Sequence, residues 1–343
     1  MTHPISLSDV VELATVDRNG VIESRHFGAL AVVDRDGTLV ASLGDPEAMI
    51  YARSTLKPFQ AIASLRAGAE LDQEALALAC ASHVGSERHQ NLAARMLADT
   101  GLSESDLRCP TAWPQETAAY QERLRQGLGQ NHLAFNCSGK HAGFLSACVA
   151  SGWDTETYLD PQHPLQLSVM AAVEEFSGAP IGNIAIDGCG APVPQMPLVG
   201  LARAVAGLLR LAADDAAGLG SAVGDPVARI APAMLAHPWA VQGQGLENTV
   251  VMERLGVLSK LGAEGVLILG APDGSALALK MLDGQSRANT VVGLNALAAL
   301  GILSQDAVDS VLEEVIKPIL GGGEPVGAIL PTPAVTSLRA AGN

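Results

Sequence analysis

Two matching hairpin patterns at opposite ends of the chain most constrain its fold. Residues 26–43 alternate between apolar and polar side chains and are interrupted by Asp36-Gly37, which predicts two strands joined by a primed turn. Late in the chain, Gly265–Gly270 leads through Asp273-Gly274 into Ala276–Leu282 in the same way. Because strands need partners, we expect the two terminal segments to pair in one antiparallel sheet.

The sequence between the hairpins is mainly helical in its spacing of apolar residues. The expected helices cover residues 54–67, 73–81, 87–100, 116–127, 139–151, 165–176 and 198–212, then about 225–236, 290–301 and 305–317. A short strand candidate, Ile184–Ile186, precedes Asp187. These patterns predict an α+β fold, with a sheet from about 10–45 and 262–290 and a helical lobe over about 54–260. No linker divides the chain, so we expect one domain over residues 1–343.

Composition narrows the class of protein and its partners. The 343 residues are 48% hydrophobic and 17% charged, which is typical of a globular protein with a substantial core. The net charge of −15 argues against nucleic-acid and anionic-membrane partners, because both require basic surfaces.

Cysteine usage and the chain start indicate a cytoplasmic protein. The five cysteines are an odd number without a disulfide-scaffold spacing, so we expect free thiols in a reducing compartment. The N-terminus lacks the basic and apolar pattern of a secretory signal, and no uninterrupted apolar run reaches the roughly 18 residues of a membrane span.

Two cysteine segments place thiols among glycines and polar side chains. Cys137 lies within Asn136–Gly143 at the expected start of a helix, where the helix dipole favours a thiolate. Cys189 lies in a glycine-rich turn. The two thiols can ligate zinc with a third ligand from Lys140 or His141, and chemistry favours His141 because neutral imidazole is a common zinc ligand. The alternative is one functional thiol and one bystander.

A serine–lysine spacing precedes these segments. Ser54 and Lys57 lie three positions apart, so on a helix their side chains can meet. A lysine activates a serine hydroxyl only when burial or a nearby cation lowers its pKa. Arg53 can contribute to that field or bind a substrate carboxylate. In the alternative, Ser54 caps an exposed helix start.

A second serine and a second lysine extend the pattern. Ser82 follows a short apolar helix, and Lys260 lies in Ser259–Gly262 just before the late hairpin. This order resembles that of serine β-lactamases and penicillin-binding proteins, although Ser82 is not followed by Asp-Asn and Leu261 stands where those proteins have Thr or Ser. Ser86 is an alternative to Ser82 and can instead cap the next helix.

Six motifs occur in the same order as in one family. They are Arg53–Pro58, Ala81–His83, Asn136–Gly143, Asp187–Pro192, Ser259–Gly265 and Lys280–Ala288. From about residue 10 to 330 the chain resembles the rhizobial inducible (thermolabile) L-asparaginases. The resemblance implies a β-lactamase- or glutaminase-like fold, a homodimer, and hydrolysis of L-asparagine to L-aspartate and ammonia.

The resemblance also implies roles for the serines and lysines. Ser54 would be the nucleophile and Lys57 its activating base, supported by the second pair, Ser82 and Lys260. We expect acyl transfer through a β-acyl enzyme, with Arg53 holding the α-carboxylate of the substrate.

For the cysteine segments, the resemblance implies a zinc ion held by Cys137, Lys140 and Cys189. This replaces the chemical preference for His141, which stays a candidate for contact with the zinc ligands or the substrate. Asp187 would hold the ammonium group of the substrate or orient a metal-bound water.

Two other functions stay open. One is a different serine–lysine hydrolase that acts on a β-lactam, an ester or a glutamine amide. The other is a non-catalytic, zinc-containing protein that binds an amino acid. Pattern alone does not separate asparagine from glutamine, because one methylene in a pocket is worth only about 1–3 kcal/mol.

Overall fold

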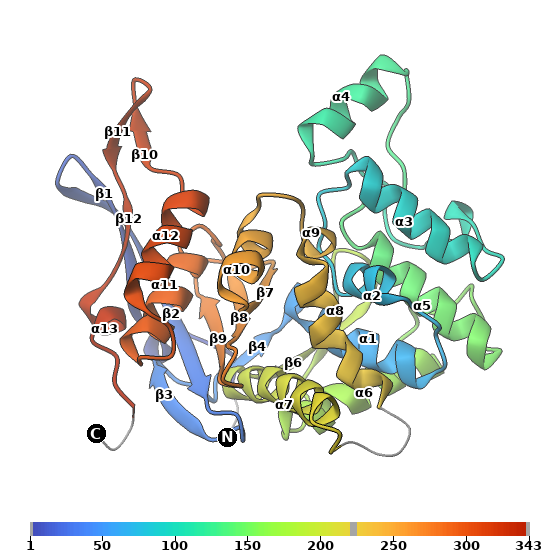
Figure 1. Cartoon of the computed structure of the whole chain (residues 1–343), viewed down its shortest axis with the longest axis horizontal. Helices are drawn as coiled ribbons and strands as arrows, with labels where there is room; N and C mark the ends of the chain where they lie inside the picture. The colour runs from blue at the N-terminus through green and yellow to red at the C-terminus, as the bar shows by residue number, and fades with distance from the viewer. Residues whose placement is uncertain (1–2, 220–224, 341–343) are drawn as a thin grey trace.

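An antiparallel sheet of seven strands joins the two ends of the chain in the computed structural model, which describes residues 3–219 and 225–340 (Figure 1). The strand order is β12 (Ile329–Pro331), β1 (Val11–Arg18), β2 (Val21–Val33), β9 (Ala276–Met281), β8 (Val266–Gly270) and β7 (Leu258–Gly262), with β3 (Leu39–Leu43) paired to β2. β2 and β9 pair from Gly28–Met281 to Val33–Ala276. The predicted pairing of the terminal segments, and with it the α+β fold, is confirmed.

The two predicted hairpins share one kind of turn. Asp34 N donates to Thr38 O at 2.9 Å, and Gly37 N donates to Asp34 O at 3.0 Å. The turn over Ala271–Ser275 repeats both bonds at 2.8 and 3.0 Å. Gly37 and Gly274 adopt φ values of +83° and +90°. Each turn therefore ends on a single left-handed glycine, and the primed turn predicted from Asp36-Gly37 is wrong.

A primed turn does occur at a position that the sequence prediction omitted. Asn19 and Gly20 have φ values of +51° and +79°, and they form the two-residue loop between Arg18 and Val21 that joins β1 to β2. Asn-Gly is a strong hairpin signal because both residues tolerate positive φ.

Helices cover both faces of this sheet. Alternate residues of the strands belong to different cores: Ala29, Ala31 and Val33 pack with α7 (Leu198–Ala216), whereas Leu30 and Val32 pack with α11 (Asn289–Ala299). Because neighbouring residues of a strand point to opposite faces, α7 and α11 lie on opposite sides of the sheet. α12 (Gln305–Val315) packs on α11, and α13 (Pro333–Thr336) also contacts α11.

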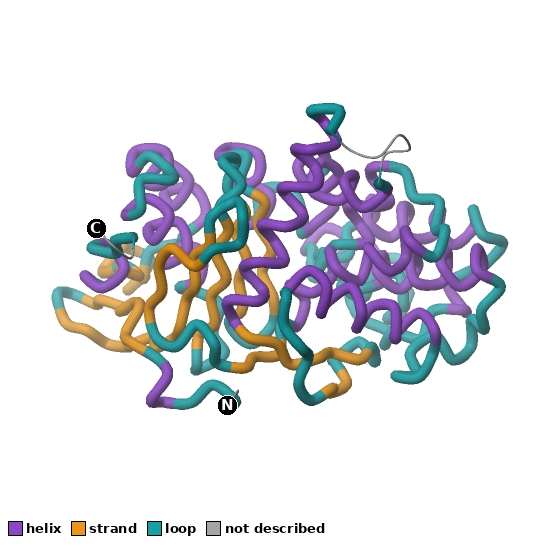
Figure 2. Tube along the Cα trace, turned by 90° about the horizontal axis from the view of Figure 1, so that it is seen from below, coloured by secondary structure: helices purple, strands orange, loops and turns teal. Residues whose placement is uncertain are grey.

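A helical lobe fills the other half of the molecule, and Figure 2 shows the main sheet and the lobe side by side. Its helices are α1 (Lys57–Arg66), α2 (Gln73–Ala79), α3 (Glu87–Ala98), α4 (Thr117–Arg125), α5 (Ser138–Ser151), α6 (Pro164–Ser177), α8 (Ile230–Ala236) and α9 (Pro238–Val241). α10 (Glu247–Leu255), which the prediction omitted, packs against β7. Short 3₁₀ turns are η1 (Leu7–Asp9), η2 (Arg53–Leu56), η3 (Glu104–Asp106) and η4 (Pro226–Arg229).

Two small sheets complete the described chain. β4 (Met49–Tyr51), β6 (Pro192–Pro197) and β5 (Ile184–Ile186) form one, and β10 (Ile319–Gly321) pairs with β11 (Glu324–Gly327) in the other. β7 begins at Leu258, so the predicted helical lobe, which extended to about residue 260, ends slightly too late. The single domain over 1–343 stays a prediction, and residues 1–2, 220–224 and 341–343 lie outside the described residues. Within the described part, no helix has the length and apolar character needed to span a membrane.

Candidate active site

Two lysines converge on the hydroxyl of Ser82. Lys57 Nζ donates to Ser82 Oγ at 2.8 Å, and Lys260 Nζ lies 2.9 Å from the same oxygen. Lys57 is the first residue of α1, Lys260 lies on the edge strand β7, and Ser82 follows α2. Lys57 Nζ also donates to Ala81 O, and Lys260 Nζ to Leu261 O at 2.7 Å. Three separate elements therefore position one serine between two amines.

The electrostatics of this pair favour one neutral amine. The Lys57 and Lys260 residues are 2% and 0% exposed, and neither forms an ion pair with a carboxylate of the described chain. Burial, together with the nearby charge of Lys57, holds the pKa of Lys260 well below its ordinary value. A neutral amine has the free lone pair that a proton acceptor requires.

Ser54 lies in η2, immediately before α1, and is partly exposed. The Ser54 hydroxyl makes no side-chain hydrogen bond within the described residues. The hydrogen bonds of Lys57 Nζ go instead to Ala81 O and Ser82 Oγ. The strand of Lys260 lies against the same turn: a Cβ on Gly262 would come within 3.1 Å of Thr55 Cγ2. This close approach holds β7 and its lysine next to the Ser54 turn.

Ser86 has a different local role. It is the N-cap of α3, where its Oγ accepts from His89 N at 3.4 Å. The lysines contact Ser82, so the two candidate serines occupy distinct places.

Arg53 and Asp187 form an ion pair near Ser54. Arg53 Nε and Nη2 lie 2.9 and 2.8 Å from the same Asp187 oxygen, Oδ1, and the side chains are 23% and 17% exposed. Arg53 has a φ of +51°, which is rare for a residue with a Cβ. Such left-handed residues gather at functional sites, where the surrounding structure offsets the strain. The pair presents a cation and an anion side by side.

The two cysteine segments meet in a second buried cluster. Cys137 is the N-cap of α5, Lys140 lies in the first turn of α5, and Cys189 lies between β5 and β6. Lys140 Nζ contacts Cys189 Sγ at 2.9 Å. Gly139 makes this arrangement possible, because a Cβ there would lie 2.5 Å from Leu78 O in the neighbouring helix. The helix end therefore packs directly on α2.

The thiolate in this cluster is Cys189. A hydrogen bond from the Cys137 thiol lowers the pKa of Cys189 despite its burial, and the charge of Lys140 lowers it further. The same hydrogen bond, together with burial, raises the pKa of Cys137 well above its ordinary value. The expectation of a thiolate at Cys137 is wrong, because the hydrogen bond to Cys189 and burial outweigh the helix dipole and the nearby charges of Lys57 and Lys140, which favour the thiolate.

His141 lies beside these sulfurs and is fully buried. Its Nδ1 is 2.7 Å from the hydroxyl of Tyr158, which already accepts a hydrogen bond from Arg108 N at 3.0 Å. A Tyr158 hydroxyl that donates to Nδ1 places the ring proton of the neutral imidazole on Nε2. Within the described residues, Nε2 has no hydrogen bond of normal geometry, although its contact with the Cys189 sulfur contributes to the lowered pKa of that thiol. Burial and the charge of Lys140 lower the pKa of His141 to about 4, so the ring is neutral. No sequence motif pointed to Tyr158.

Two further residues hold the site and were not assigned a site role from sequence. Asn248 Oδ1 accepts from Leu261 N at 3.0 Å and from Ser259 Oγ at 3.1 Å, which satisfies polar groups of the edge strand beside Lys260. His83, next to Ser82, lies 2.9 Å from Ser138 Oγ and links the serine loop to α5. In the sequence, the Gln242–Gly245 loop that precedes Asn248 had no assigned role.

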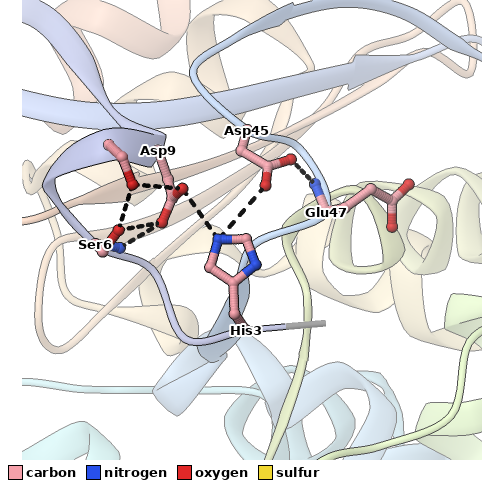
Figure 3. Close-up of polar contacts among 6 residues, drawn as sticks. His3, Ser6, Asp9, Asp45 and Glu47 are labelled. Atoms are coloured by element: carbon pink, nitrogen blue, oxygen red, sulfur yellow. Dashed lines mark hydrogen bonds and ion pairs between the residues drawn. The ribbon is translucent and has the colours of Figure 1, made fainter. Parts of the chain in front are cut away.

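A third polar cluster lies at the start of the chain (Figure 3). His3 Nε2 is 3.0 Å from Asp9 Oδ1 and 3.9 Å from Asp45 Oδ2, a spacing at which a cation can be held. Asp9 also accepts from the backbone and hydroxyl of Ser6 at 2.7 Å each. These bonds satisfy both Asp9 oxygens, so the cluster fastens the N-terminal segment to the loop before β4.

The α+β fold holds a serine between two buried lysines, an arrangement in which a neutral lysine can act as a proton acceptor. Residues 14–331 match the L-asparaginase II family, so the chain belongs to that family and is an amidohydrolase. The family resemblance predicted from the motifs is confirmed.

The solved structures similar to this chain include three that cover most of it. A Bacillus glutaminase crystallised in 4.3 M NaCl has a TM-score of 0.32 and 11% identity over 74% of this chain and 83% of that one. The probable glutaminase ybaS has a TM-score of 0.31 and 15% identity over 76% and 81%. Mglu in its native form has a TM-score of 0.32 and 12% identity over 85% and 81%. These TM-scores are low, so the fold class is assigned from the strand order and the layers described above. A comparison with curated proteins gave no match.

Proposed function

We propose that this amidohydrolase hydrolyses L-asparagine to L-aspartate and ammonia, with Ser54 as the nucleophile. The observation that carries the proposal is the position of Ser82 Oγ between Lys57 Nζ and Lys260 Nζ, because Lys57 directly follows the turn that bears Ser54. Family membership supports the amide substrate class.

In the proposed reaction, Ser54 Oγ attacks the carbon of the side-chain amide and transfers its proton to Lys57. Ser82 then connects Lys57 to Lys260, whose lowered pKa lets it take a proton through the shared hydroxyl. The leaving nitrogen receives a proton from this chain of groups and departs as ammonia. Water attacks the remaining β-acyl ester by the reverse route and releases aspartate.

Arg53 and Asp187 are proposed to bind the amino-acid end of the substrate. The Arg53 guanidinium uses Nε and Nη2 toward Asp187, and its Nη1 lies 3.9 Å from Glu264 Oε1, an exposed carboxylate that the α-carboxylate of the substrate would replace. The second oxygen of Asp187 is then available to the α-ammonium group. This pairing matches the opposite charges of a free amino acid and disfavours an ester or a β-lactam without both groups.

We propose zinc as the resident metal of the second cluster, held by Cys137, Lys140 and Cys189. The residues fit the ion once Lys140 releases the proton that the two cysteines hold on it by raising its pKa: two buried sulfurs and a buried amine lie together, and zinc prefers nitrogen and sulfur ligands. When bound, zinc would supply Lewis acidity or order the pocket. His141 Nε2 carries the ring proton, so we assign it as a hydrogen-bond donor to the Cys189 sulfur and Lys140 as the ligand.

The proposal also covers assembly and compartment. Exposed apolar side chains, Val21, Ile22 and Leu320, gather where the β1–β2 turn lies against β10–β11, and we propose that this surface contributes to a homodimer. The five cysteines are buried and free, which supports a reducing, cytoplasmic location.

The test is ammonia release from L-asparagine, L-glutamine and a chromogenic β-lactam by the purified chain, with Ser54→Ala alongside. Turnover of asparagine that is lost in the variant supports the proposal. Activity that survives Ser54→Ala contradicts the nucleophile. Saturable asparagine binding without turnover would instead support a non-catalytic binder.

A further inference from the structure

A cavity of about 410 Å³ lies between the C-terminus of α6, α7 and the β2–β3 turn. None of its lining residues belongs to the Ser82 or Cys189 sites. Three of them are arginines: Arg35 from the turn, and Arg203 and Arg210 from α7. On a helix, residues seven apart return to the same face, so both α7 arginines border one opening.

These guanidinium groups lack the usual partners of arginine. Within the described residues, none of the three forms an ion pair with a carboxylate, whereas arginines elsewhere on the molecule do. Arg203 Nε donates to Gly37 O at 3.2 Å, which fixes the group and leaves its terminal nitrogens free. In a chain with a net charge of −15, three unpaired arginines around one cavity form a local positive site.

The acidic groups of the wall do not cancel this charge. Glu175 is held by both terminal nitrogens of Arg66, at 2.6 and 2.8 Å, so its charge is already compensated. Asp36 is the other carboxylate that lines the cavity, and it lies at the exposed turn. Three arginines therefore face one uncompensated carboxylate.

The floor of the cavity is apolar and rigid. Gly207 lies between the two arginines of α7, and a Cβ there would come within 3.3 Å of the Phe176 ring. Glycine is unfavourable inside a helix relative to alanine, and here its lack of a side chain keeps the floor open. Phe176 packs on Phe59, with ring centroids 6.1 Å apart, so the ring cannot move into the space.

We propose that this cavity binds a small anion with two or more negative charges, carried by phosphate or carboxylate groups. Guanidinium groups match planar and tetrahedral oxyanions through paired hydrogen bonds, and three of them suit a multivalent ligand. A second cavity of about 320 Å³ shares Arg35 and Arg210, so there is room for a ligand longer than a single phosphate. The proposal is independent of the reaction at Ser54.

The test is calorimetric titration of the full chain with pyrophosphate and with citrate, at constant ionic strength. These probes separate the phosphate and carboxylate sources. We expect saturable binding of at least one probe, weakened about tenfold or more in Arg35→Ala/Arg210→Ala, since each lost charged hydrogen bond typically costs about that factor. The control, Arg88→Ala/Arg254→Ala, removes the same charge from exposed arginines outside the cavity and should bind as the wild type does.

Arg203→Lys gives an independent check, because it keeps the charge and loses the fork of donors. It should weaken binding less than the double alanine variant. Circular dichroism and thermal unfolding serve as the folding controls for all variants, so the binding test does not depend on turnover of asparagine. Absence of binding by both probes, or equal loss in the cavity variant and its control, would overturn the proposal.

Discussion

Ser82 Oγ accepts a hydrogen bond from Lys260 Nζ at 2.9 Å, although 178 positions separate the two residues. Lys57 Nζ reaches the same oxygen from the other side. Two charged amines around one hydroxyl would repel each other in a buried site, so the arrangement favours one neutral lysine. Ser82 thereby connects an amine beside Ser54 to a second amine on the sheet edge.

The two serines are expected to differ in the severity of their loss. Ser54→Ala removes the nucleophile, so kcat should fall by roughly 10³-fold or more. Ser82→Ala leaves the nucleophile and interrupts proton transfer, so we expect a smaller fall, of about 10²-fold, with residual turnover. Mass spectrometry during turnover should locate the acyl group on the Ser54 peptide in both the wild type and Ser82→Ala.

Ser86→Ala is the matched control for these variants. It removes the N-cap of α3 and should cost about 1 kcal/mol of stability without lowering kcat. An acyl group found on Ser82, or an inactive Ser86→Ala that is still folded, would contradict the assignment.

We expect Lys260 to lower the stability of the folded chain and to be required for activity. The pKa of Lys260 in the folded chain is held well below the ordinary 10.5. At pH values between this lowered pKa and 10.5, Lys260 is protonated in the unfolded chain and neutral in the folded chain. Stability of the wild type therefore rises with pH through that range. Lys260→Met should lose this rise, gain about 0.5–2 kcal/mol near neutral pH, and lose most activity.

The same lysine sets the acid side of the rate profile. The wild-type kcat should decrease as pH falls through the lowered pKa of Lys260, because the protonated amine cannot accept a proton. Thermal unfolding at several pH values and a pH profile of kcat measure both effects. The control is Lys317→Met, because Lys317 is an exposed lysine that follows α12. This variant should change neither the pH dependence of stability nor the pH profile of kcat.

Much of the fold was predictable because it follows from local patterns. The alternation in residues 26–43 and 265–282 identifies strands directly, and the apolar spacing of α5 and α7 identifies helices. The predicted sheet region of about 10–45 includes β1, but the Asn19-Gly20 hairpin that joins β1 to β2 was not identified. β7 was not predicted as a strand, and the late sheet segment was started at about residue 262, because a five-residue edge strand next to a helix carries little periodic signal.

The site was less predictable because its contacts are tertiary. Motif order predicted which side chains belong to the site, and the structure brings Cys137, Lys140 and Cys189 together. That Lys57 contacts Ser82 follows from the packing of α1 against α2, which spacing does not show. The pairing of Arg53 with Asp187 likewise depends on where β5 ends relative to η2.

Arg53 offers a way to separate strain from function. A φ of +51° is energetically unfavourable for a residue with a Cβ, whereas glycine adopts it without this penalty. Arg53→Gly and Arg53→Ala both remove the guanidinium and should both raise KM for asparagine. Arg53→Gly should be more stable than Arg53→Ala by about 1 kcal/mol, as measured by chemical denaturation. Equal stability of the two variants would mean that the backbone relaxes at this position.

The cysteine cluster predicts metal content. The purified chain should hold about one zinc ion, and Cys137→Ser and Cys189→Ser should each lose it, because hydroxyl groups are poor zinc ligands. Cys148→Ser is the matched control: Cys148 is buried in the same helix, α5, with no contact to the cluster in the described structure, and its zinc content should equal that of the wild type.

Tyr158→Phe tests the arrangement around the proposed ion more finely. The variant removes the hydroxyl that donates to His141 Nδ1, so the ring can place its proton on either nitrogen and no longer presents Nε2–H to Cys189. In Tyr158→Phe, the zinc affinity should fall about 10–100-fold, as measured by competition with a chromophoric chelator. If His141 were itself a zinc ligand, His141→Ala would lose the ion altogether. Retention of zinc by His141→Ala, together with its loss from Lys140→Met, would assign the third ligand to Lys140.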